Sequence, residues 1–168
     1  MKRILLLATI LFSWNVSCFS QYIYGPCKDS LKVENPFFYC PDLFLPVCAC
    51  DNNTYRSSCV AEDQNAISDN NWTVGPCTNL FYAIYPNQVY DYLNLRIAKK
   101  NAGFFTVTIY DYFGHIYFSQ VFTYPNLSPG EYERKEIYVN GFEQGLYIIE
   151  VVSDGEQQIE KFFKVSFE

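Results

Sequence analysis

Seven cysteines are the residues whose type and spacing say most about the chemistry of this 168-residue chain. Cys18 stands apart, and the other six gather between residues 27 and 77: Cys27, Cys40, Cys48, Cys50, Cys59 and Cys77. In an oxidising compartment, an even number of cysteines within about fifty residues predicts three disulfides, because so small a domain cannot bury enough apolar surface unaided. Spacing alone does not choose among the pairings that six cysteines allow.

Zinc is the alternative use of these thiols, since Cys48 and Cys50 are separated by a single residue. Structural zinc sites usually place two or more residues between paired cysteines, and the chain's one histidine, His115, is remote in sequence. The sequence therefore favours disulfides and predicts no metal and no cofactor. Because no nucleophile pattern surrounds His115, we also expect the protein not to be an enzyme.

The charge balance limits the partners of the chain. It carries 12 Lys and Arg against 18 Asp and Glu, for a formal net charge of −6. Binding to nucleic acid or to an anionic membrane surface depends on clustered Lys and Arg, so neither is expected. Aromatic residues make up 19% of the chain, which argues for a folded protein rather than a disordered one.

The first twenty residues have the pattern of an export signal. A short basic start precedes an apolar run over residues 4–12, which is too short to span a bilayer but fits the core of a signal peptide. Small residues at Cys18 and Ser20 predict cleavage directly after Ser20. The alternatives are a lipoprotein signal with Cys18 lipidated, which Asn15 disfavours, and a retained anchor. We expect a protein that is secreted or on the outer cell surface, with no transmembrane segment after removal of residues 1–20.

The second half of the chain is organised by alternation of apolar and polar residues. Phe105 to Tyr110 has the pattern of a half-buried strand, and Asp111 to Gly114 supplies a turn in which Gly114 can take positive φ. Strands are expected at 93–97, 105–110, 115–122, 135–139, 146–153 and 159–167. They predict an all-β antiparallel, immunoglobulin-like sandwich over residues 85–168. Residues 78–84 are the expected linker, with apolar residues 80–82 able to pack, and Lys99-Lys100 is interpreted as a solvated turn.

The segment from Pro46 to Cys59 resembles the core of Kazal-type serine protease inhibitors, in which Pro-Val-Cys-Gly leads through Asp-Gly and Thr-Tyr to the next cysteine. Cys40 and Cys48 are separated by seven residues and Cys48 and Cys59 by ten, as in that family, and Gly75-Pro76-Cys77 matches its ending. One family cysteine is missing, and Cys50 stands where a small residue is common. The chain looks like the variant with Cys-x-Cys in its core.

This resemblance implies a small disulfide-rich α+β domain over residues 21–77. Its helix would fall at residues 60–67, which contain acceptable helix formers. The resemblance also implies the disulfides Cys27–Cys50, Cys40–Cys59 and Cys48–Cys77.

In Kazal-like inhibitors the segment between the second and third cysteines fits a serine protease cleft. Here the contact residues would be Pro41, Asp42, Leu43, Phe44 and Leu45, supported by Tyr55 and Ser57, with Leu43, Phe44 and Leu45 exposed. Asp42 would enter the specificity pocket. A trypsin-like pocket would repel it, and an apolar pocket would bury its charge unpaired, so the expected partner is a serine protease with a basic specificity pocket. The alternative is a non-inhibitory extracellular interaction or adhesion module.

Residues 82–168 are similar to the C-terminal sorting domain (Por secretion tail) of proteins exported by the type IX secretion system of Bacteroidota-type bacteria. The residues that carry the resemblance are Tyr85, Pro86, Asn87, Gly114, Gly145, Tyr147 and Lys161. The resemblance implies recognition by the secretion machinery at the outer membrane, with the domain retained or cleaved afterwards. Gln88 and His115 depart from the family pattern. The alternative is a sandwich that serves adhesion or spacing.

Overall fold

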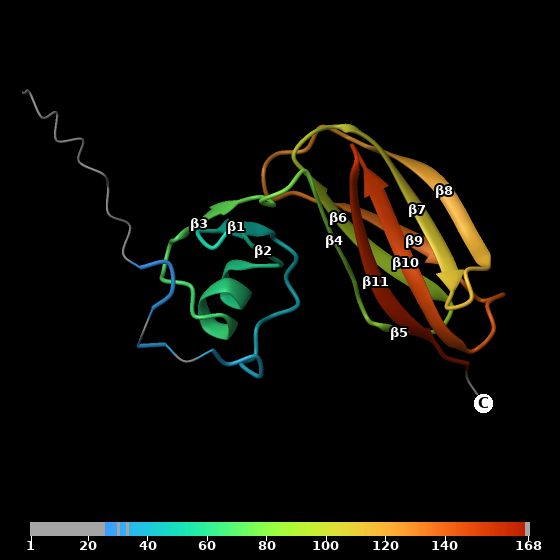
Figure 1. Ribbon diagram of the computed structural model, residues 1–168, viewed down its shortest axis with the longest axis horizontal. Helices are drawn as coiled ribbons and strands as arrows, with labels where there is room; N and C mark the ends of the chain where they lie inside the picture. Colours follow the sequence, from blue (N-terminus) through green and yellow to red (C-terminus); the bar gives the residue numbers. More distant parts are fainter. Residues whose placement is uncertain (1–25, 30, 33, 167–168) are drawn as a thin grey trace, which may run out of the picture.

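The computed structural model describes residues 26–29, 31–32 and 34–166 (Figure 1). The predicted signal peptide and its cleavage site lie outside the described residues. The chain forms two parts that lie side by side in Figure 1: a disulfide domain ending at Cys77 and a β-sandwich beginning at Leu80.

The disulfide domain is built on a three-stranded antiparallel sheet. Strand β1 (Val47–Ala49) lies between β2 (Thr54–Tyr55) and β3 (Trp72–Val74). The helical element η1 (Val60–Gln64) follows β2 and is shorter than the helix expected over residues 60–67. It ends there because Ala66 has a positive φ of 56°, which a right-handed helix does not permit.

The core of this domain is small. The buried cluster holds Val47, Ala49, Ala61 and Ile67, with Cys27, Tyr55 and Trp72 packed against it. The structure joins Cys27 to Cys50, Cys40 to Cys59 and Cys48 to Cys77, the same pairs that the Kazal resemblance implies. A carboxylate oxygen of Asp63 lies near the sulfurs of Cys40 and Cys59. Because all six sulfurs are bonded in pairs, however, they offer none of the thiolates that a structural zinc site requires.

The β-sandwich consists of two sheets. The larger has the order β5-β11-β10-β7-β8 and contains β5 (Gln88–Val89), β7 (Gly103–Asp111), β8 (Ile116–Tyr124), β10 (Gly145–Ser153) and β11 (Glu156–Lys164). The smaller has the order β4-β6-β9 and contains β4 (Leu80–Ile84), β6 (Tyr92–Lys99) and β9 (Glu133–Tyr138). Every pairing is antiparallel except β5 with β11, which is parallel and departs from the expected all-antiparallel sandwich.

The apolar residues of the alternating pattern form the core between the two sheets. Successive side chains of a strand point to opposite faces, so every second residue of β10 is buried: Tyr147, Ile149 and Val151. Strand β6 contributes Leu93, Leu95 and Ile97 from the facing sheet to the same cluster. Each of the six predicted strands overlaps a strand of the structure.

The sandwich begins earlier than the sequence suggests. Residues 80–84, expected to lie in the linker, form β4, which pairs with β6 and buries Leu80, Tyr82 and Ile84. Only Thr78 and Asn79 then lie between Cys77 and the sandwich. The apolar alternation of this segment is five residues long, too short to separate a strand from a linker that merely packs.

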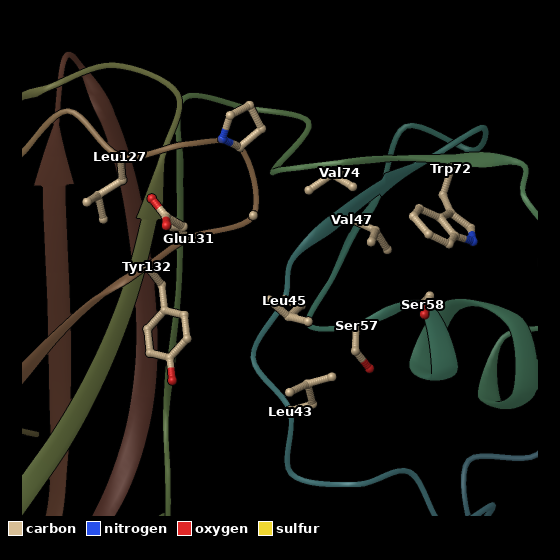
Figure 2. Close-up of a pocket in the computed structure, with 12 residues that line it drawn as sticks. Leu43, Leu45, Val47, Ser57, Ser58, Trp72, Val74, Leu127, Glu131 and Tyr132 are labelled. Atoms are coloured by element: carbon tan, nitrogen blue, oxygen red, sulfur yellow. The ribbon is translucent and has the colours of Figure 1, made fainter.

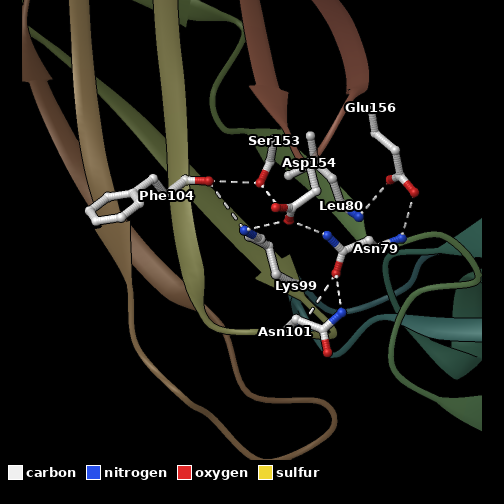
Figure 3. A network of polar contacts seen from close by, with 8 residues as sticks. All are labelled: Asn79, Leu80, Lys99, Asn101, Phe104, Ser153, Asp154 and Glu156. Carbon is white, nitrogen blue, oxygen red and sulfur yellow. Dashed lines mark hydrogen bonds and ion pairs between the residues drawn. The ribbon is translucent and has the colours of Figure 1, made fainter.

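A polar network fixes the chain where it enters the sandwich (Figure 3). Glu156 accepts the Asn79 N–H at 3.0 Å on one carboxylate oxygen and the Leu80 N–H at 2.8 Å on the other. Lys99, expected to lie in a solvated turn, is only 6% exposed, and its Nζ lies 3.1 Å from Asp154 Oδ2. The Asn79 side-chain amide donates to the same Asp154 carboxylate. The network thus sets the position of the residues that follow Cys77.

Removing the Cys27–Cys50 disulfide in a Cys27→Ser, Cys50→Ser double variant should lower the free energy of unfolding of the disulfide domain by about 3 kcal/mol. The bond links residues 23 apart in sequence, and opening that loop restores entropy to the unfolded chain. Urea titration monitored by Trp72 fluorescence measures the change. The sandwich, which contains no cysteine, should keep its own transition. An unchanged transition of the disulfide domain would contradict the prediction.

Acid should weaken the network around Lys99. The hydrogen bond from Lys99, followed by that from Ser153, holds the pKa of Asp154 below its ordinary value of 3.8. A carboxyl with a lowered pKa contributes stability that is complete above the ordinary value and is lost as the pH falls through the lowered one. Between pH 5 and pH 2 the wild type should therefore lose more unfolding free energy than Asp154→Asn in urea titrations. Asp91→Asn, at an exposed carboxyl of the sandwich, should follow the wild type.

Candidate functional site

The backbone of the candidate protease-binding loop, residues 41–47, is held at both ends. The Cys40–Cys59 disulfide anchors its start, and its last residue, Val47, is paired with Tyr55 and Val74 in the sheet. Between them the Leu45 N–H donates to the Arg56 carbonyl oxygen at 2.8 Å. These constraints fix the loop conformation before any partner binds.

The loop presents its side chains to two different environments. Leu43 and Leu45 are exposed by 48% and 44%, as expected, but the prediction that Phe44 is exposed is wrong, because only 2% of it is accessible. Its ring stacks on Phe81 at a centroid distance of 5.7 Å and meets Tyr132 edge-on at 5.1 Å. Both partners belong to the sandwich, so the loop lies against the second half of the chain.

Asp42, the expected specificity residue, forms an ion pair with an arginine of the sandwich. Its two carboxylate oxygens accept from the two terminal nitrogens of Arg96 at 3.1 and 2.9 Å, a bidentate ion pair. Arg56 of the disulfide domain lies 3.8 Å from the same carboxylate. Arg96 is on β6, and its guanidinium lies 5.9 Å from the centroid of the Tyr85 ring. The hydrogen bond to Asp42 raises the pKa of Arg96 further above its ordinary value, so the guanidinium remains charged.

The two predicted loop-support residues act in different ways. Tyr55 supports the loop through strand pairing with Val47, while its hydroxyl donates to Asp51 at 2.7 Å. Burial, followed by the hydrogen bond to Asp51, raises the pKa of Tyr55 to about 12. Ser57 is buried, and its hydroxyl accepts the Val60 N–H at 3.4 Å at the start of η1. Ser57 therefore helps to fix the helical element next to the loop.

A pocket of about 540 Å³ separates the rest of the loop from the sandwich (Figure 2). Leu43 and Leu45 lie on one wall, and Leu127 and Tyr132 lie on the other. At its rim the two parts approach closely, because a Cβ added to Gly130 would lie 2.5 Å from Val74 Cγ1. Gly130 also has a positive φ of 89°, so glycine is the residue that fits there.

The residues predicted to form the sorting motif divide into surface and core positions. Tyr85, Asn87 and Lys161 are exposed and line a common hollow of about 460 Å³ beside Ile84 and Glu160. Burial raises the pKa of Glu160. The Asn87 carbonyl oxygen accepts the Phe163 N–H at 2.8 Å, which ties this segment to β11. Pro86, also exposed, lies between Tyr85 and Asn87, so the first part of the motif is accessible to a partner.

The remaining motif residues shape the sandwich itself. Gly114 takes a positive φ of 91° in the turn between β7 and β8, and Gly145 begins β10. Tyr147 is buried, with its ring stacked on Phe162 at 5.6 Å and its hydroxyl donating to the Glu143 carbonyl oxygen at 3.0 Å. His115 lies in the Gly114 turn, where its Nδ1 is 2.9 Å from Asp111 Oδ2.

Comparison with known families decides the nature of the second half. Residues 83–165 match the model of the secretion system C-terminal sorting domain. This half of the chain is a type IX sorting domain. The protein is therefore exported by type IX secretion to the cell surface or released, and its sorting domain interacts with the secretion machinery.

The comparisons leave the first half without a family. No Kazal match is found over residues 27–77, and a comparison with curated proteins gives no match. Within the described residues, no helix has the length and apolar character needed to span a membrane.

Sequence reasoning missed Arg96 and Tyr132, two of the sandwich residues that contact the loop. Both are far from it in sequence, and neither belongs to a motif. An unpaired arginine on a predicted strand, in a chain with an excess of acidic residues, carries no signal of which carboxylate it binds. Only the packing of one domain on the other brings these residues together.

Truncating Phe44 to alanine should lower the free energy of unfolding by about 3 kcal/mol, because a fully buried ring is lost between Phe81 and Tyr132. Leu43→Ala is the matched control, since this neighbouring side chain is exposed and its truncation should cost less than about 0.5 kcal/mol. Urea unfolding of both variants measures the difference. Equal, small losses would show that Phe44 does not dock on the sorting domain in solution.

Proposed function

We propose that this exported chain carries a Kazal-like domain, residues 21–77, which binds and inhibits a serine protease through loop 41–47. The observation that carries the proposal is the set of three disulfides around this loop, whose pairing agrees with the pairing that the Kazal resemblance implies. The role is one of binding rather than catalysis. The sorting domain delivers this domain to the outside of the cell.

The fixed backbone supports inhibition. A loop held by Cys40 and by Val47 loses little conformational freedom when it binds, so the ordering cost that weakens flexible peptides is largely avoided. Leu43 and Leu45 are exposed and can supply apolar contacts to a protease cleft. Asp42 would determine specificity, because a carboxylate is favourable only in a pocket that offers a cation.

A non-inhibitory interaction module is the second candidate. It is favoured by the engagement of Asp42 with Arg96 and of Phe44 with Phe81 and Tyr132 in the intact chain. A module of this kind would use the disulfide domain as a rigid element, and its loop would remain bound to the sorting domain. The two candidate functions differ in whether a protease can bind the loop.

Titration of the oxidised full chain against two classes of serine protease separates the candidates. We expect stoichiometric inhibition of a protease that cleaves after acidic residues and none of trypsin. Asp42→Lys should reverse this preference, because its cation fits the carboxylate of a trypsin-like pocket. Asp63→Lys, on the exposed side of η1, is the matched control and should leave the preference unchanged. No inhibition of either class by the wild type or Asp42→Lys would reject the inhibitor and leave the module.

A further inference from the structure

On the outward face of the β4-β6-β9 sheet, one residue of a cross-strand row contacts loop 41–47. Ala83 of β4, Arg96 of β6 and Arg134 of β9 are direct neighbours across the strands. Arg96 is the middle residue of the row and projects toward the disulfide domain, where it binds Asp42. Arg134 binds Asn94 and Glu136 on its own face instead.

The ion pair is partly shielded from water. The Arg96 side chain is 19% exposed and that of Asp42 is 38% exposed. Two parallel N–H···O bonds fix the carboxylate in direction as well as in distance, which a single lysine could not do. Arg56 is also near, at 3.8 Å, so Asp42 has two guanidinium groups close to it, the kind of cationic environment that a basic specificity pocket would offer.

The aromatic contact of Phe44 is the second interaction that attaches loop 41–47 to the sandwich. Phe44 is inserted between Phe81 at the start of the sandwich and Tyr132 in the connection before β9. Phe44 lies two residues beyond Asp42, so the ion pair and the aromatic contact involve the same side of the loop. Leu43 and Leu45 instead face the pocket between the domains, and this side of the loop is not packed.

We propose that the sorting domain caps the loop from within the chain, so that its Arg96 and Tyr132 compete with a protease for Asp42 and Phe44. Capped and protease-bound states of the loop are then mutually exclusive. The cap itself stands on the contacts described here, and only the identity of the competing partner rests on the proposed function. A cap reduces the apparent affinity of the loop by the fraction of molecules in which it is open. Loss or displacement of the sorting domain would free the loop outside the cell.

The test uses the full oxidised chain with Arg96→Ala, and with Arg134→Ala as a control. Both variants remove one cation from the same sheet face, but only Arg96 touches the loop. In Arg96→Ala the Phe44 ring, which is buried while the loop is capped, should be oxidised by hydroxyl radicals several-fold faster than in Arg134→Ala, because the loop leaves the sandwich more often. Inhibition of a protease that cleaves after acidic residues should tighten by a similar factor.

Two further measurements keep the outcome clear. Arg96→Lys retains the charge but loses the bidentate geometry and should give an intermediate rate of Phe44 oxidation, which guards against general unfolding of the alanine variant. Equal rates of Phe44 oxidation in Arg96→Ala and Arg134→Ala would overturn the cap. Faster oxidation without tighter inhibition would overturn the competition. If no variant inhibits any protease, the proposed function fails, and the oxidation rates alone then decide whether the cap exists.

Discussion

Three disulfides are the constraint on which the first half of the molecule depends. In the part of this domain that the structure describes, the core cluster has four buried apolar residues, too few to balance the conformational entropy of some fifty residues by burial alone. The crosslinks reduce that entropy in the unfolded chain instead. They also fix the loop between Cys40 and Cys48, so the same bonds that allow this domain to fold give it a surface of defined shape.

The second half is stabilised in a different way. Its two sheets enclose a continuous cluster of seventeen buried apolar side chains, and no cysteine is needed. A domain built on alternating strands can tolerate many outward-facing residues, and this leaves Tyr85, Asn87 and Lys161 free to form an accessible surface hollow.

The short connection makes the two halves interdependent. Only Thr78 and Asn79 separate the last disulfide from β4, and Glu156 and Asp154 hold Asn79 in place. The disulfide domain is thereby kept beside the β4-β6-β9 sheet of the sandwich. This proximity allows Arg96 to reach Asp42 and allows Phe44 to enter between Phe81 and Tyr132.

Local pattern in the sequence was sufficient for much of the fold and for the family of the second half. Alternation placed six strands because side-chain direction in a strand depends only on parity. Glycines such as Gly114 marked a turn because few other residues adopt positive φ. The resemblance of the first half implied the disulfide pairs that the structure contains.

The tertiary structure alone decided what the loop touches. Strand β4 escaped prediction because five alternating residues resemble a linker that packs, and the parallel β5 is too short to carry a pattern. Lys99 is buried rather than solvated because Asp154, fifty-five positions later in the chain, supplies its countercharge. Likewise, the partner of Asp42 depends on how two separately folded surfaces meet, and charge complementarity over such sequence distances leaves no periodic or spaced signal in the chain.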